Sequence, residues 1–270
     1  MKKKTLRIIG ITSLILGALL FVYIGIISVW GELEASFFNA GLRSEEPLET
    51  LSCPAVITSR ETAAVSGTFY NPFDKSANME IRTYVTAGFV TLMNEFITTF
   101  TLEPGNTKIV EVPIIPEDAA YERVIMVRMH QMKRIPFPYQ NASCGIVVIN
   151  FPLLTGAQFI TLILSLGTAL SAGGITLWAV NSKPIVWLRL KIFVAMIIFA
   201  LTSASIAAIG LIGFWGLALI MTVVWIFMGL GMIWQFSTAS KKNLFNQNLG
   251  SEINSSQRFF GVKDYDSKDK

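Results

Sequence analysis

Residues 8–30 read IIGITSLILGALLFVYIGIISVW, an apolar stretch without a charged residue or a histidine. Three later stretches share this character: Gly156–Val180, Ile192–Leu211 and Gly216–Phe236. Each has about 20 residues or more, the length at which a helix rising 1.5 Å per residue crosses about 30 Å of hydrocarbon. The sequence therefore predicts an α-helical membrane protein with four transmembrane helices.

The composition agrees with a membrane protein. Hydrophobic residues make up 52% of the 270 residues and charged residues only 15%, whereas soluble domains have about 25% charged residues. The mean hydropathy is +0.54. The four stretches also lack the ionisable side chains on which ion coupling, proton relays and haem ligation depend.

Basic residues concentrate in the segments that lie on one side of the membrane if the four helices cross it in turn. Residues 1–7, 181–191 and 237–270 together hold 13 Lys and Arg, with four acids, whereas residues 31–155 hold nine Lys and Arg against fourteen Asp and Glu. The positive-inside rule then predicts cytoplasmic N- and C-termini and an extracytoplasmic segment 31–155, in a plasma or inner membrane. Membrane lipid is the expected partner of the basic residues. Nucleic-acid binding is not expected, because the sequence shows no clustered basic face with aromatic platforms.

The first stretch also resembles a secretory signal, because a basic start precedes an apolar run. Its 23 apolar residues exceed the usual 7–15, and no A-x-A cleavage site follows. We expect residues 1–7 to be a cytoplasmic N-terminus and residues 8–30 a retained signal anchor. Residues 156–236 are then a three-helix transmembrane unit, and residues 237–270 a polar, flexible cytoplasmic tail.

Residues 31–155 change texture to short alternating segments separated by turn residues such as Asn71-Pro72 and Pro104-Gly105. Seven short strands with such punctuation favour an extracytoplasmic all-β sandwich with a juxtamembrane linker. The predicted strands are Ala55–Thr58, Ala63–Tyr70, Met79–Thr86, Glu95–Leu102, Lys108–Ile114, Arg123–His130 and Cys144–Ile149.

Two segments of this domain carry a resemblance at the level of the fold. VSGTFYNPFDKSANMEIRTYV (65–85) and TFTLEPGNTKIVEVPI (99–114) resemble the immunoglobulin-like or fibronectin-III-like β-sandwiches found outside many membrane proteins. The resemblance covers about residues 50–150 and implies a sandwich that mediates contacts. The antibody-type Cys…Trp…Cys core is missing, because the domain contains no Trp, and no family is recognised for the whole chain.

The two cysteines, Cys53 and Cys144, both fall in the outer segment, near its two ends. In an oxidising compartment we expect them to form one disulfide. The alternative is two buried free thiols. Closing a loop of this size is worth about 4–5 kcal/mol in the chain-entropy treatment.

The residues between the first span and the first strand leave two interpretations open. Leu33, Phe37, Phe38 and Leu42 could form one face of a short helix in the outer membrane interface. Alternatively, this segment is a linker whose aromatic side chains pack under the sandwich.

Catalytic chemistry is not expected. His130 is the only histidine, so no multi-histidine metal site exists, and a packed imidazole is the simpler interpretation. The sequence has no P-loop, no G-x-S-x-G, no H-E-x-x-H and no Rossmann fingerprint. We therefore predict no enzyme activity, no catalytic residue, no metal and no cofactor.

Small residues recur every four positions in two of the spans, where they let helix backbones approach closely. One set has Gly167 and Ser171 on a parallel ridge, and the other has Ser203 and Ala207. Whether the packing partner lies within the chain or in another subunit stays open. The predicted helix-packing residues are Ser165, Ala169, Gly173, Ala200, Ala204 and Ala208.

Asn141-Ala142-Ser143 is a sequon on the outer side, so Asn141 is a possible glycosylation site.

These expectations together favour a non-enzymatic accessory or structural subunit of a membrane protein complex, which binds partners through its outer sandwich and its helix faces. Other membrane-protein subunits are the expected partners. The alternative is a small transporter, channel component or lipid-handling membrane protein.

Overall fold

The computed structural model describes residues 3–39, 46–48, 50–135, 137–182, 186–232 and 234. Its helices are α1 (Lys3–Asn39), α2 (Gly156–Asn181), α3 (Val186–Leu211) and a further helix, Trp215–Met232. Its strands are β1 (Glu46–Pro47), β2 (Leu51–Ser52), β3 (Val56–Thr58), β4 (Ala63–Tyr70), β5 (Ala77–Ala87), β6 (Phe89–Leu102), β7 (Thr107–Ile114), β8 (Val124–Gln131) and β9 (Gln140–Ile149), with a 3₁₀ turn, η1, at Pro116–Asp118.

The apolar stretches of the sequence lie on these helices, and all four helices are long and apolar enough to cross a membrane. Helix α1 extends past the predicted end at Trp30 to Asn39. Residues 32–38, ELEASFF, contain no Gly or Pro, so no residue stops the helix there. The predicted linker therefore begins as helix, while Leu42 and the tail 237–270 lie outside the described residues.

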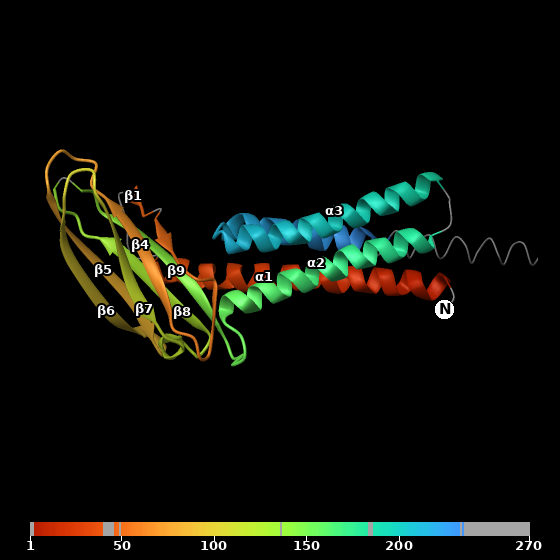
Figure 1. Ribbon diagram of the computed structural model, residues 1–270, viewed down its shortest axis with the longest axis horizontal. Coiled ribbons are helices and arrows are strands. Elements are labelled where there is room, and N and C mark those ends of the chain that lie inside the picture. The colour runs from red at the N-terminus through yellow and green to blue at the C-terminus, as the bar shows by residue number, and fades with distance from the viewer. Residues whose placement is uncertain are drawn as a thin grey trace, which may run out of the picture. The chain divides into compact units, whose positions relative to one another are not determined.

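Each of the seven predicted strands overlaps an observed strand, and β1 and β2 are short additional ones. Strand β6 starts at Phe89, well before the predicted Glu95, because Phe89, Met93 and Asn94 continue the antiparallel pairing with β5 on the two sides of a register shift at Thr86/Ala87. The strands form two sheets (Figure 1). The larger has the order β1-β9-β8-β5-β6, with β3 also pairing in parallel with β9, and the smaller has the order β2-β4-β7.

The two sheets bury one shared hydrophobic core, because alternate side chains of each strand point to the same side. Strand β7 illustrates the pattern, with Val110, Val112 and Ile114 buried and the residues between them exposed. The other principal core residues are Val65, Phe69, Met79, Ile81, Val85, Ile125, Val127, Met129 and Ile146.

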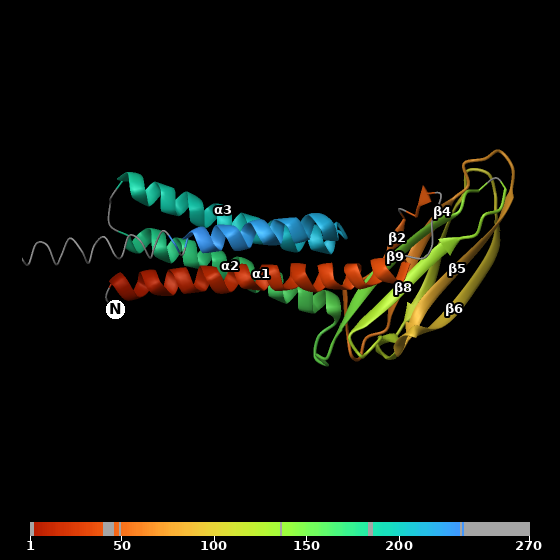
Figure 2. The same ribbon diagram turned by 180° about the vertical axis from the view of Figure 1, so that it is seen from behind.

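A second, smaller cluster covers the opposite side of the larger sheet. Val124, Met126 and Val147 of β8 and β9 are buried there, with Ile27 and Phe38 of α1 packed against them. The C-terminal end of α1 therefore lies on β8 and β9, as Figure 2 shows from behind.

Helix α1 also packs against α2 and α3, and its contact with α2 depends on glycine. A Cβ added to Gly10 would lie 2.8 Å from the carbonyl oxygen of Gly174, and one added to Gly17 would lie 2.7 Å from that of Gly167. Both helices thus present glycines seven residues apart, and these meet in antiparallel pairs. Ser13 Oγ adds a hydrogen bond to the Leu170 carbonyl oxygen at 2.9 Å.

The small-residue ridges take different positions from one another. Gly167 and Ser171 are buried against α1, whereas the ridge of Ser165, Ala169 and Gly173 is exposed. On α3, Ala200 and Ala204 are partly buried against hydrophobic clusters, and Ala208 is exposed. The exposed ridge is therefore not used for packing among the described residues, since it lies on the face of α2 opposite to α1.

Candidate interaction face of the larger sheet

The polar face of the larger sheet results from strand alternation. In β5, Met79, Ile81 and Val85 point into the core. Successive side chains in a strand point to opposite faces, so Glu80, Arg82 and Tyr84 lie on the other side. The register places neighbouring polar side chains from β6 and β8 beside them: Tyr84 lies opposite Glu95 and Arg128, and Arg82 lies opposite His130.

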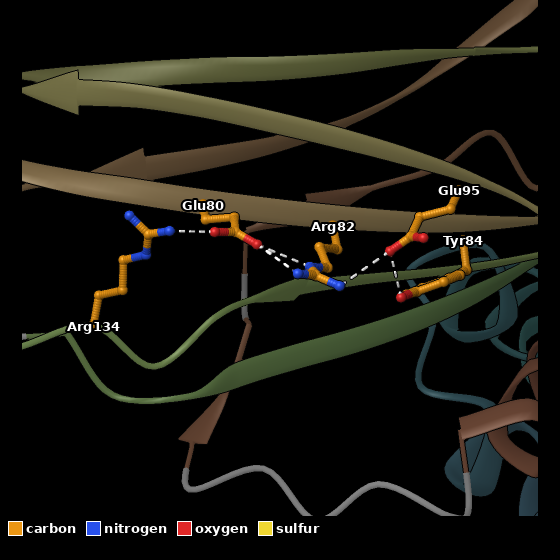
Figure 3. Close-up of polar contacts among 5 residues, drawn as sticks. All are labelled: Glu80, Arg82, Tyr84, Glu95 and Arg134. Atoms are coloured by element: carbon orange, nitrogen blue, oxygen red, sulfur yellow. Dashed lines mark hydrogen bonds and ion pairs between the residues drawn. The ribbon is translucent and has the colours of Figure 1, made fainter.

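Four of the residues on this face, Glu80, Arg82, Tyr84 and Glu95, form one continuous polar row with Arg134, which follows β8 (Figure 3). Arg82 Nε donates to Glu80 Oε1 at 2.9 Å, and Arg82 Nη1 lies 3.4 Å from Glu95 Oε1. The Tyr84 hydroxyl donates to Glu95 Oε1 at 2.6 Å, and Arg134 forms an ion pair with the other oxygen of Glu80. The hydrogen bond from Arg82 lowers the pKa of Glu80, and the bond to Glu95 raises the pKa of Tyr84.

The polar row balances its own charges. Two arginines alternate with two carboxylates, and each carboxylate accepts from more than one donor. Exposed pairs of this kind add little stability. Their effect is to align the outer face of β5 with the neighbouring strands.

Arg128 connects this face to helix α1. Its guanidinium lies 4.8 Å from the ring centre of Tyr84 and 5.3 Å from that of Phe38, and its Nη1 lies 3.4 Å from the Phe38 carbonyl oxygen. Cation–π contacts of a partly desolvated arginine contribute about 1 kcal/mol. Arg128 thereby holds the last turn of α1 against β5 and β8.

His130 is a packed histidine. Its ring lies between those of Tyr84 and Tyr139, at centroid distances of 5.3 and 5.7 Å, and the residue is 6% exposed. Burial, assisted by the positive charges of Arg128 and Arg82, lowers the pKa of His130 to about 4. The imidazole is therefore neutral at physiological pH.

The helix and the sheet meet most closely at a pair of glycines. A Cβ added to Gly145 in β9 would collide with the backbone of Gly31 in α1. Only glycine at position 145 leaves room for the helix backbone to lie directly on the strand.

A second attachment point joins the sheets to α2. The backbone amide of Gly156, at the start of α2, donates to Glu61 Oε2 at 2.6 Å, and the amide of Thr58 donates to the same oxygen at 3.2 Å. The Glu61 carboxylate thus bridges the end of β3 and the N-terminus of α2, where a negative charge is favourable. With the glycine pair, this fixes the β-domain to two helices.

The predicted disulfide is present between Cys53 and Cys144. Cys53 follows β2 in the smaller sheet, and Cys144 lies in β9 of the larger sheet, with a Cα–Cα distance of 6.5 Å. The bond therefore links the two sheets across the core rather than the edges of one sheet.

The possible glycosylation site lies within the larger sheet. Asn141 is in β9, between β1 and β8, and is 6% exposed. Glycosylation of Asn141 stays a prediction, and attachment of a sugar would require its side-chain amide to be accessible.

The described residues contain no group of three or more His, Cys, Asp or Glu side chains that could hold a metal ion. One hollow of about 600 Å³ lies at the end of the β-domain where β4 and β8 end. Its lining includes Phe69, Tyr70, Phe73, Phe137 and Gln131, and no ionisable group other than the Tyr70 phenol. It therefore offers apolar contact and an amide but no acid–base pair.

Two features of this arrangement were not predicted from the sequence, although each has a signal there. The seven-residue spacing of Gly10 and Gly17, matched by Gly167 and Gly174, was the available signal for the α1–α2 contact. The alternation of Glu80, Arg82 and Tyr84 was the available signal for the polar row.

No protein-family model and no curated protein matches this sequence. Solved structures with partial similarity include Bacteroides uniformis beta-glucuronidase 2 covalently bound to cyclophellitol-6-carboxylate aziridine, at 18% identity and a TM-score of 0.26. The match covers 36% of this chain and 12% of the glucuronidase chain. Another is the CsuC–CsuE chaperone-tip adhesion subunit complex of Acinetobacter baumannii, at 12% identity and a TM-score of 0.24, covering 43% of this chain and 61% of that one. Similarities this low carry no conclusion about activity.

Proposed function

We propose that this protein is an integral membrane, non-enzymatic accessory subunit of a membrane protein complex. Its outer β-domain, an immunoglobulin-like sandwich, binds a partner protein, and its helices pack against lipid and other subunits. Both termini are cytoplasmic in this proposal, and residues 31–155 lie outside.

The membrane assignment is supported by the four apolar helices and by the charge distribution between them. The disulfide in segment 31–155 supports an oxidising, extracytoplasmic environment for that segment.

The immunoglobulin-like assignment is supported by strand order. Strands β2, β4 and β7 in one sheet and β9, β8 and β5 in the other correspond in order to strands A, B, E and G, F, C of a constant-type immunoglobulin domain. The disulfide joins the sheets, as it does in antibody domains, but from different strands. Domains of this architecture serve many functions, so the function is argued from attachment and surface chemistry.

The observation that carries the proposal is the fixed mounting of the β-domain on the helices. Helix α1 continues without a break onto the larger sheet, with the Gly31–Gly145 approach, the Arg128–Phe38 contact and the Glu61–Gly156 hydrogen bond as attachments. A domain held in this way presents its outer surfaces in one orientation, which suits a subunit that positions a partner.

The first test is the mass of the full-length protein purified in mild detergent from the membranes in which it is expressed naturally. We expect stable subunits that co-purify in fixed stoichiometry. A lone monomer or homo-oligomer carrying only lipid would contradict the proposal. Saturable solute flux from the purified chain in liposomes would favour the transporter alternative instead.

A second test addresses orientation. The native cysteines form a disulfide, so a cysteine introduced at Asn106, an exposed residue of the turn before β7, is the only free thiol. We expect an impermeant maleimide added to intact cells to label Asn106→Cys and not Lys3→Cys. Labelling of both positions from outside would contradict the proposed topology.

A further inference from the structure

The two sheets have four edges, and three of them carry features that hinder pairing with another strand. Strands β1 and β3, which both pair with β9 at one edge of the larger sheet, have two and three residues, and edge strand β2 of the smaller sheet has two. Edge strand β7 carries Lys108, Glu111 and Pro113. Short edges, charged side chains and proline are the devices by which proteins prevent edge-to-edge association.

Of these devices, strand β6 carries only one charged side chain. It is the longest strand, with 14 residues, FVTLMNEFITTFTL, and it contains no Lys, Arg, Pro or Gly. Its single charge, Glu95, is already bonded to Arg82 and Tyr84. Strand β5 occupies one side of β6, and no strand of the described residues pairs with the other side. About half of the β6 backbone amides and carbonyls therefore point outward, as at any sheet edge.

The side chains of β6 are also apolar and uncovered over much of its length. Leu102 is buried in the core, but Phe96, on the same face of the strand, is 36% exposed, and Leu92, beside the register shift, is 54% exposed. On the opposite face Ile97 is 54% exposed, and Met93 is exposed as well. An occupant lying beside β6 would bury apolar surface on both faces.

We propose that the free edge of β6 binds an extended segment of a partner protein by strand addition. This inference rests on the proposed function and identifies the surface through which the partner is bound. The exposed row of backbone groups requires a strand as the occupant, since only a strand supplies donors and acceptors at a matching spacing. The occupant is uncharged and rich in apolar and threonine residues, because the exposed side chains of β6 are mainly apolar or threonine and its one charged residue, Glu95, is already paired.

The test uses the full-length protein in its native complex. A double variant, Leu92→Lys/Ile97→Lys, places two charges beside the free edge. Ile109→Lys is the matched control, because Ile109 is 59% exposed on β7, an edge strand that already carries charges. We expect the double variant to retain at least tenfold less partner than the wild type, and the control to retain it fully. Formation of the Cys53–Cys144 disulfide confirms that each variant folds.

Hydrogen exchange adds a readout of the backbone itself. We expect the outward amides of β6 to exchange at least tenfold more slowly in the complex than after the partner is removed, with β8 amides unchanged. Full retention of the partner by the double variant, or equal exchange of β6 in both states, would overturn the strand-addition site and leave the proposed function intact.

Two other outcomes are decisive. If the wild-type chain binds no partner, the proposed function fails, and the site fails with it. If the purified chain alone has twice its monomer mass and protected β6 amides, a second copy occupies the edge, and the assignment of a different partner is overturned.

Discussion

Helix α1 makes two kinds of close contact along its length, one with helices and one with a sheet. Against α2, its contact repeats, because Gly10 and Gly17 meet Gly174 and Gly167 one after the other. Against the larger sheet, the closest contact is the single pair Gly31–Gly145. A repeated contact distributes the effect of one substitution over several sites, whereas a single contact concentrates it.

The surroundings differ as well. The helix–helix contact is almost entirely apolar, with one hydrogen bond from Ser13 and one from Arg7 Nε to the Asn181 carbonyl oxygen at 2.8 Å. The helix–sheet contact adds a cation, Arg128, packed on Phe38 and Tyr84. Helix α1 is therefore attached to the β-domain by a few specific contacts and to α2 by close backbone packing.

The prediction with the largest expected effect on stability tests whether the β-domain is stable independently of the helices. Replacing both cysteines, Cys53→Ala/Cys144→Ala, removes the cross-link between the sheets. We expect a loss of about 4 kcal/mol in the stability of the β-domain, because the closed loop is long. Hydrogen exchange should accelerate in β8 and β9 and stay unchanged in α2. Equal acceleration in α2 would show that the two regions unfold as one unit.

The second prediction breaks the helix–sheet contact directly. In Gly145→Val the new side chain collides with the backbone of Gly31. A helix backbone cannot move aside as a flexible side chain could, so the collision is not relieved locally. We expect a loss of about 3 kcal/mol and faster exchange of the last turns of α1. Gly105→Val is unsuitable as a control, because Gly105 has a φ of +71°, a backbone conformation that is strained for any residue other than glycine. The control is therefore Thr91→Val, at an exposed position of β6. A Gly145→Val protein as stable as this control would contradict the close approach.

The third prediction tests the repeated helix contact. In Gly17→Ala the added methyl meets the Gly167 carbonyl oxygen and Ser171, and we expect a loss of about 1–2 kcal/mol. Gly173→Ala is the matched control, because a Cβ there meets no described atom within 4 Å. Thermal unfolding in detergent should separate the two variants. If Gly173→Ala instead reduces subunit retention without affecting stability, the exposed ridge of α2 packs against another subunit.

The smallest expected effect concerns pH and the sheet face near α1. The pKa of His130 falls from its usual 6.5 to about 4 in the folded protein, so protonation favours the unfolded chain. The stability from the neutral imidazole is complete above pH 6.5 and is lost as the pH falls from 6.5 towards 4. We expect a loss of about 1 kcal/mol at pH 6, measured by exchange of β8 amides. His130→Phe should remove this dependence, and an unchanged profile would contradict the burial argument.

Much of the secondary structure could be predicted from local sequence. The helices follow from long uncharged stretches, and β4 was predicted at its observed bounds, Ala63–Tyr70. The start of β6 was missed because Phe89–Asn94 carries no clear alternation, and it becomes a strand by pairing with β5. The sequon at Asn141 predicts a possible glycosylation site, and the burial of this residue between neighbouring strands could not be read from that motif.

The sequence by itself determined four apolar helices and the strand segments of the β-domain, because these depend on the chemistry of neighbouring residues. It also determined that the two cysteines both lie in segment 31–155. Only the tertiary structure decided that Gly31 meets Gly145 and that Ser165, Ala169 and Gly173 stay exposed while Gly167 is buried. It also decided that, in the described part of the chain, no strand pairs with the outer side of β6. Each of these depends on two segments far apart in the chain and on the rotation and register with which they pack. A periodic pattern defines a face of one element, and the partner of that face is set by three-dimensional packing.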